Sequence, residues 1–210
     1  MNVLSSRLQC LIEDLYRLES PLRVEDFCVD AASLVDVVDL RGKREMLLIV
    51  TDEHATDVGL FIAEEVIEGA QRFVDSTDVL DRADAIDDFC VALEGVSHFV
   101  YFMFCGNAQT RPVSLIELEL QAELDKFLFL RLLCPVPELR ERLFARFRLR
   151  EGLLPEEEER YRVANARAHR YARWLDEKFS RGAVDEALED ARALYRKPLE
   201  FKLDHIDRAA

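Results

Sequence analysis

Two apolar stretches decide the fold that this sequence predicts: residues 84–105, DAIDDFCVALEGVSHFVYFMFC, and residues 114–133, SLIELELQAELDKFLFLRLL. In each stretch apolar residues recur at steps of three and four, which is the period of a helix. Because both are apolar around most of their circumference, we expect two long buried helices, Asp84–Cys105 and Ser114–Leu133. Gly106–Val113 would form the loop between them, and the rest of the chain is expected to pack around this pair.

Both predicted helices carry ionisable side chains where a core helix normally has none. On the first, Glu94 and His98 lie one turn apart. The second has two polar stripes, and periodicity alone does not decide which one points inward. The stripes consist of Glu119, Glu123 and Lys126, and of Glu117, Gln121 and Asp125. We expect the stripe of Glu117, Gln121 and Asp125 to face solvent. Glu117 is also expected to form a capping box with Ser114.

A third long helix is predicted over Pro155–Ser180, because a proline and four glutamates suit a helix start. It places more polar groups beside its packing face. Since a buried charge needs a partner, the three helices together predict either a structural network or a site. The candidate residues are Glu94, His98, Glu119, Glu123, Asn165, His169, Arg162 and Arg173.

One interpretation of these residues is a metal site, because carboxylates and imidazoles from facing helices hold iron or manganese in dimetal bundles. The candidate ligands for iron, manganese or zinc are Glu94, His98, Glu123 and His169. Those bundles use Glu-x-x-His twice, whereas this chain has one pair, spaced i, i+4. The alternative is a hydrogen-bonded network of carboxylates with histidine or arginine. We favour the network, since the chain also lacks the G-x-S-x-G, P-loop, G-x-G-x-x-G and H-E-x-x-H motifs.

A basic strip is predicted on a shorter helix over Glu138–Arg150. Arg142, Arg146 and Arg150 follow one another at steps of four. The strip could bind a phosphate, a nucleic acid or an acidic partner. We favour pairing within the chain, because residues 111–210 hold 20 basic and 20 acidic residues.

Charge and cysteine content restrict the partners and the compartment. The net charge is −14, and residues 1–110 hold 8 Lys/Arg against 22 Asp/Glu, so the N-terminal half repels nucleic acid and anionic membranes. Five cysteines without a C-x-x-C pair argue against a disulfide framework or a zinc knuckle. No apolar run of about 20 residues is free of charges, which argues against a membrane span. We therefore expect a cytoplasmic protein.

The first 75 residues or so have a mixed pattern. Helices are expected over residues 3–18 and 63–73, with a brief one over Ala31–Val38. The strongest strand candidates are Glu45–Thr51 and Asp57–Ile62, joined by a hairpin loop that carries His54. A short strand is possible at Phe27–Val29.

The predicted fold class is α+β, predominantly α, with a small N-terminal two- or three-stranded sheet followed by an irregular bundle of six helices. The expected division is an N-terminal part, 1–78, and a bundle, 79–210, unless the two form one continuous domain.

Two functional classes fit these observations. The first is a non-enzymatic regulatory or protein-interaction module that binds a protein partner, or itself, through exposed apolar surface. The second is a metal-dependent helical-bundle enzyme that uses the carboxylates and histidines of the central helices. We favour the first class, because the metal spacing departs from the known pattern and no other catalytic motif is present.

Overall fold

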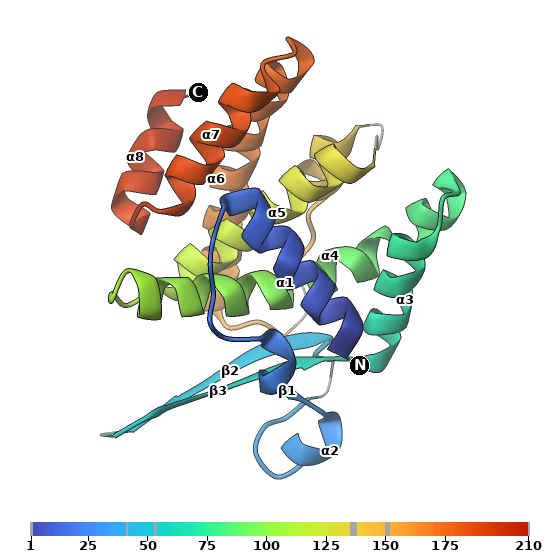
Figure 1. Ribbon diagram of the computed structural model, residues 1–210, viewed down its shortest axis with the longest axis vertical. Helices are drawn as coiled ribbons and strands as arrows, with labels where there is room; N and C mark the ends of the chain where they lie inside the picture. The colour runs from blue at the N-terminus through green and yellow to red at the C-terminus, as the bar shows by residue number, and fades with distance from the viewer. Residues whose placement is uncertain (1, 41, 53, 135–137, 150–151, 210) are drawn as a thin grey trace. The chain divides into compact units, whose positions relative to one another are not determined.

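The computed structural model describes residues 2–40, 42–52, 54–134, 138–149 and 152–209, without the side chains of residues 2 and 79–81. It confirms the predicted fold class: the chain is α+β and predominantly α, with a small three-stranded sheet in its N-terminal part (Figure 1).

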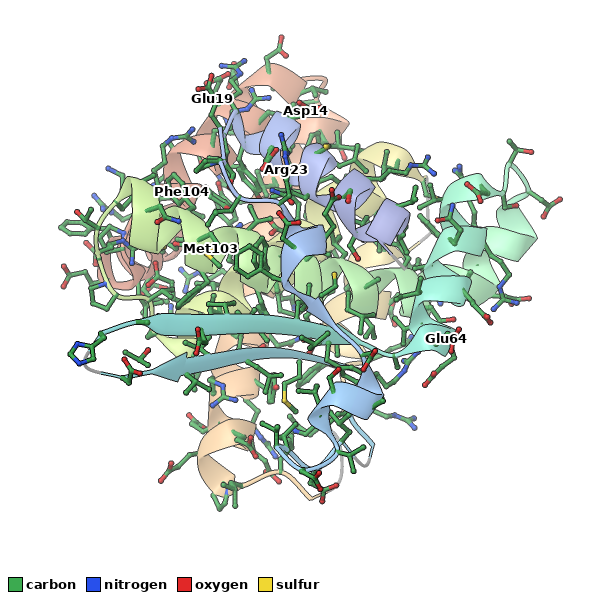
Figure 2. All side chains as sticks on the ribbon, turned by 60° about the horizontal axis from the view of Figure 1, so that its bottom comes forward. Asp14, Glu19, Arg23, Glu64, Met103 and Phe104 are labelled. Carbon is green, nitrogen blue, oxygen red and sulfur yellow. The ribbon has the colours of Figure 1, made fainter. Side chains whose placement is uncertain are left out.

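The chain divides into two compact units. The N-terminal unit comprises Met1–Glu13 and Glu19–Phe104, and the C-terminal unit comprises Asp14–Leu18 and Cys105–Ala210. Figure 2 labels Asp14, Glu19 and Phe104, close to which the chain passes from one unit to the other. The division into domains 1–78 and 79–210 stays a prediction.

The sheet of the N-terminal unit has the order β1-β3-β2. Its strands are β1 (Cys28–Val29), β2 (Glu45–Thr51) and β3 (Thr56–Ile62). β2 and β3 form the predicted antiparallel hairpin, and β1 runs parallel to β3. The central strand β3 is buried from Gly59 to Ile62, whereas the edge strand β2 has no buried residue despite its apolar sequence.

Four α-helices begin in the N-terminal unit among the described residues. They are α1 (Asn2–Tyr16), α2 (Ala31–Leu34), α3 (Glu64–Asp75) and α4 (Val79–Met103). Asp30 caps α2, because its Oδ1 accepts a hydrogen bond of 2.8 Å from the backbone N–H of Ser33. The expected continuation of α2 to Val38 is wrong: the helix stops at Leu34, before β-branched residues that disfavour helix. α4 begins five residues earlier than expected.

α4 packs closely on its neighbours at two glycines. A Cβ at Gly69 of α3 would collide with the side chain of Asp88 on α4. A Cβ at Gly95 would lie 3.3 Å from Leu60 Cδ1 of the sheet. A stacked pair of rings, Phe73 and Phe89 with centroids 4.2 Å apart, fills the space between α3 and α4.

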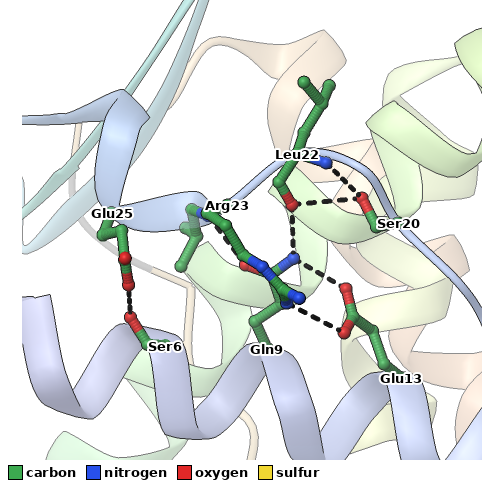
Figure 3. A network of polar contacts seen from close by, with 8 residues as sticks. Ser6, Gln9, Glu13, Ser20, Leu22, Arg23 and Glu25 are labelled. Carbon is green, nitrogen blue, oxygen red and sulfur yellow. Dashed lines mark hydrogen bonds and ion pairs between the residues drawn. The ribbon is translucent and has the colours of Figure 1, made fainter.

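A buried glutamine ties the start of the chain to the segment that leads into the sheet (Figure 3). Gln9 on α1 is 1% exposed, and its Nε2 donates to Leu22 O at 2.7 Å. Its Oε1 accepts from the backbone N–H of Val24, also at 2.7 Å. Glu13 accepts a further bond from Gln9 Nε2 at 2.7 Å and pairs with Arg23 at 3.5 Å. One side chain therefore satisfies two backbone groups at the entry to the short 3-10 helix Val24–Phe27.

We predict that Gln9→Ala lowers the free energy of unfolding by about 1–3 kcal/mol, because it leaves the Leu22 carbonyl and the buried Val24 amide without these bonds. Urea denaturation followed by circular dichroism measures the change. The control is Gln71→Ala, which removes a surface bond of 2.7 Å to Asp75 in the same unit and should cost much less. Equal losses in the two variants would refute the role assigned to Gln9.

The C-terminal unit is helical throughout its regular elements. It contains α5 (Leu115–Leu133), α6 (Pro155–Ser180), α7 (Val184–Tyr195) and α8 (Leu199–Ala209). Ser114 caps α5 as predicted, since its Oγ accepts from the backbone N–H of Glu117 at 3.3 Å. α6 has the predicted bounds, and Gly182 just beyond its end has the left-handed φ of +78° that favours glycine.

The predicted helix Glu138–Arg150 is wrong in length and type. The structure has a π-helical segment, Glu141–Ala145, in its place, and Arg150 lies outside the described residues. A π-helix bonds i to i+5, so steps of four no longer define one face. Arg142 and Arg146 therefore do not form the regular stripe that the sequence predicted.

One helical segment, Arg82–Ala108, is long and apolar enough to cross a membrane, with a mean hydropathy of 1.5. Its most apolar window is 67% buried within the protein, as is also usual for a core helix of a globular protein.

Candidate functional site

On α4 the first two predicted site residues lie together. The ligand atoms of Glu94 and His98 are within 4.8 Å of each other, as expected for a spacing of i, i+4. His98 is 7% exposed, and its Nδ1 lies 3.9 Å from Glu45 Oε2 on β2. That separation is an ion-pair distance and too long for a hydrogen bond. Sequence reasoning missed Glu45, the first residue of β2, whose carboxylate lies on the sheet face that Gly95 approaches.

On α5 the two predicted carboxylates pair with cations of their own unit. Glu123 accepts a bond of 2.7 Å from Lys126 Nζ one turn further along. Glu119 Oε1 lies 3.4 Å from Arg160 Nε on α6. Both carboxylates are largely buried, 8% exposed for Glu119 and 9% for Glu123, so these pairs offset much of the cost of burying their charge.

On α6 two of the predicted residues, Asn165 and His169, are largely or partly buried. Asn165 is 9% exposed, and its Nδ2 has no hydrogen-bond partner in the described part of the chain. His169 is half-buried and stacks on Phe144 with ring centroids 5.3 Å apart. Partial burial, and then the charges of Arg140 and Arg173, lower the pKa of His169, so its imidazole is neutral at physiological pH.

The two predicted arginines lie at the surface. Arg173 is exposed, and Arg162 is paired with Glu158 at 3.2 Å with its side chain 60% exposed. In the predicted basic strip, Arg146 lies 3.4 Å from Glu138 and 3.5 Å from Glu141. These pairs within the chain agree with the favoured interpretation of that strip. Glu94 and His98 belong to one unit and Glu119, Glu123 and His169 to the other, so their convergence stays a prediction.

The second polar stripe of α5 does not face solvent, and that expectation was wrong. Glu117, Gln121 and Asp125 are 2%, 1% and 0% exposed. The reason is that α5 is buried on all sides from Glu117 to Leu130, so both polar stripes point inward. The carboxylate of Glu117 is held by Arg111, with two bonds of 2.7 and 3.1 Å.

A buried lysine completes this network. Lys202 on α8 is 0% exposed, and its Nζ donates to Gln121 Oε1 at 2.5 Å. Gln121 Nε2 in turn donates to Asp125 Oδ1 at 2.8 Å. The same Asp125 oxygen accepts from the hydroxyl of Tyr16 at 2.5 Å. Each of these polar groups thus has a hydrogen-bond partner within the network. A buried polar network is stable only when its members are satisfied in this way.

Sequence reasoning missed Lys202, although the sequence contains a signal for its burial. Lys202 lies three residues after Leu199 and four before Ile206, so it falls on the apolar stripe of α8. A lysine at such a position is expected to be buried with a carboxylate nearby. We assign this network to stability, because its members are buried and each is hydrogen-bonded to another member.

We predict a pH-dependent stability that is specific to Lys202. Burial lowers the pKa of Lys202 from 10.5 to about 8, although Glu117 and Asp125 oppose the shift. Between these values the unfolded chain binds a proton that the folded chain does not. The free energy of unfolding should therefore rise with pH across this window, by about 3 kcal/mol from this one group.

Urea unfolding of wild type and Lys202→Met from neutral pH to pH 10.5 tests this expectation. The wild type should gain stability relative to the variant as the pH rises, because methionine fills a similar volume and has no proton to lose. A difference between the two proteins that stays constant with pH would contradict the lowered pKa.

The N-terminal unit has a pocket between α2 and α3, which we call the α2–α3 pocket. Its volume is about 760 Å³. Its floor is formed by Phe61, Ile62 and Ala63 at the end of β3, and its walls include Leu40 and Ile67. Figure 2 shows Glu64, the first residue of α3, at the end of the sheet opposite the hairpin turn.

The rim of the α2–α3 pocket is acidic. The ionisable residues that line it are Asp30, Lys43, Glu64, Glu65 and Glu68. Four carboxylates thus face one ammonium group among the described lining residues. All five side chains are exposed, so partners in solution can reach them.

A second, shallower hollow adjoins the first. It is formed mainly by residues 35–40 and shares Ala31 and Leu40 with the α2–α3 pocket. Two valines on this loop project into solvent, Val35 at 74% and Val37 at 68% exposed. Sequence reasoning missed this surface, because a helix was expected where the chain forms the loop.

Comparisons with models of protein families, with curated proteins and with solved structures find no match. The fold and the geometry of these sites are therefore the basis for the function proposed below.

Proposed function

We propose that the chain is a non-enzymatic protein-interaction module whose N-terminal unit carries the binding surface. The observation that supports this most is the pair of exposed valines, Val35 and Val37, beside the α2–α3 pocket. A single exposed apolar residue is ordinary at a protein surface. Exposed valines next to a pocket with an apolar floor and a polar rim are typical of an interaction surface.

The edge of the sheet adds to this surface. Ile49 and Val50 on β2 are 37% and 62% exposed, and β2 is one of the two edge strands of the sheet that the structure describes. An edge strand with exposed apolar side chains is a common pairing site for other chains. The ion pairs of Glu119 and Glu123 also favour a structural role for the α5 carboxylates.

Photo-crosslinking in the cells that make the protein tests the proposal. A photoreactive benzoyl-phenylalanine replaces Val37, and a control chain carries the same group at Leu154, which is 64% exposed in the other unit. We expect a discrete crosslink to another protein from position 37 and none from position 154. No product at position 37 above the control would refute an interaction surface at this place.

The second candidate function is the metal-dependent enzyme, which is favoured by the proximity of Glu94 and His98 on α4. That function requires stoichiometric iron, manganese or zinc in protein purified without a chelator. It also requires that His98→Ala and Glu123→Ala each lose the metal. Elemental analysis decides between the candidates, since the interaction module predicts only traces of metal in all three proteins.

A further inference from the structure

We propose that the α2–α3 pocket binds a short segment of a partner protein in which an apolar side chain is flanked by lysine or arginine. This inference rests on the proposed function and names the partner chemistry of the same surface. It is carried by the shape, the charge and the surroundings of the pocket.

The floor of the pocket selects an apolar side chain. Phe61, Ile62 and Ala63 line the pocket with apolar side chains and are otherwise buried, at 6%, 5% and 7% exposed. A volume of about 760 Å³ lies within the range of pockets that enclose ligands. It exceeds the volume of one aliphatic or aromatic side chain, so it can also hold part of the neighbouring backbone.

The rim selects positive charge next to that side chain. Glu64 and Glu68 lie one turn apart on α3, so both carboxylates lie on the same side of the helix. Hydrogen bonds from Ser33 lower the pKa of the Asp30 carboxyl, which is therefore ionised at neutral pH. Because residues 1–110 have a net charge of −14, they attract a basic segment from a distance as well as at contact.

The same charges argue against the other ligand classes. Nucleic acid, anionic lipid surfaces and phosphorylated segments all bring negative charge to a rim that is already negative. A compact small molecule would leave the adjoining hollow and its exposed valines uncovered. An extended peptide segment can cover Val35 and Val37 while its anchor lies in the α2–α3 pocket.

Peptide selection on the intact chain tests the inference. Short random peptides displayed on phage are selected on the wild-type protein, and selected sequences are then synthesised with a fluorescent label. The rim-reversed variant carries Glu64→Lys and Glu68→Lys. The matched control carries Glu156→Lys and Glu159→Lys, which make the same charge change at exposed positions near the start of α6.

We expect selected peptides to combine Lys or Arg with Leu, Ile, Val, Phe or Met. Fluorescence anisotropy should show binding weakened by roughly tenfold or more in the rim-reversed variant and nearly unchanged in the control. Added salt should also weaken binding to the wild type.

Three outcomes would overturn the inference. Selected peptides without basic residues, bound equally well by the rim-reversed variant, would refute the partner chemistry but leave the interaction module standing. Failure to select any peptide over bare support, while position 37 still crosslinks, would do the same. Self-association of the wild type that is lost on rim reversal would assign the pocket to a second copy of this chain.

Discussion

Asp125→Ala is expected to lower the free energy of unfolding by about 3–5 kcal/mol, the range found when one partner of a buried charge pair is removed. Asp125 is 0% exposed and is one of the two carboxylates, with Glu117, that stabilise the charged form of Lys202. Its loss also leaves the hydroxyl of Tyr16 and the amide of Gln121 without their acceptor. Unsatisfied groups of this kind add their own desolvation cost.

The matched control for this variant is Asp204→Ala on α8. The Asp204 side chain is 76% exposed and lies 3.5 Å from Arg208, so its pair is screened by water and worth little. Urea denaturation at neutral pH measures both variants. A loss in Asp125→Ala as small as that in Asp204→Ala would contradict a buried network that holds the C-terminal unit together.

Gly69→Ala is expected to destabilise the N-terminal unit by roughly 2–3 kcal/mol, although alanine is the better helix former. An added Cβ would lie 2.6 Å from Asp88 Cβ and closer still to its carboxylate. Asp88 has little room to yield, because it is also paired with Arg44. α3 and α4 would have to separate, which disturbs the stacked rings of Phe73 and Phe89.

Gly106→Ala provides the comparison for this substitution. Nothing lies within 4 Å of a Cβ at Gly106, and its backbone does not have a positive φ. Alanine there should be neutral or slightly stabilising, because it restricts the unfolded chain. Thermal unfolding of the two variants measures the contrast, and similar melting temperatures would show that the helices do not meet at Gly69.

The elements that local chemistry specifies were predictable from the sequence. Glu45–Thr51 and Pro155–Ser180 have the predicted bounds, since an alternating or continuous apolar run and a Pro-Glu helix start are local signals. The caps at Asp30 and Ser114 are also local, and both were predicted correctly. Residues 35–38 were harder, because their apolar spacing fits the predicted helix to Val38, whereas their β-branched side chains disfavour it.

The inward direction of polar side chains was not predictable in the same way. A helical wheel places Glu117, Gln121 and Asp125 on one stripe, but only the surrounding helices decide that this stripe is buried. Lys202 lies 77 or more positions away in the sequence and meets them only in the folded unit. The α2–α3 pocket likewise depends on the parallel pairing of β1 with β3, whose ends lie beside α3. No local sequence pattern reveals that pairing.

Our central proposal is that the acidic rim and the exposed valines of the N-terminal unit bind a protein partner. The most direct measurement is the yield of the crosslink from position 37 in living cells, compared between the native rim and the rim with Glu64→Lys and Glu68→Lys. The proposal predicts a clear product with the native rim and roughly tenfold less with the reversed rim. Equal yields from the two rims, or no product from either, would contradict it.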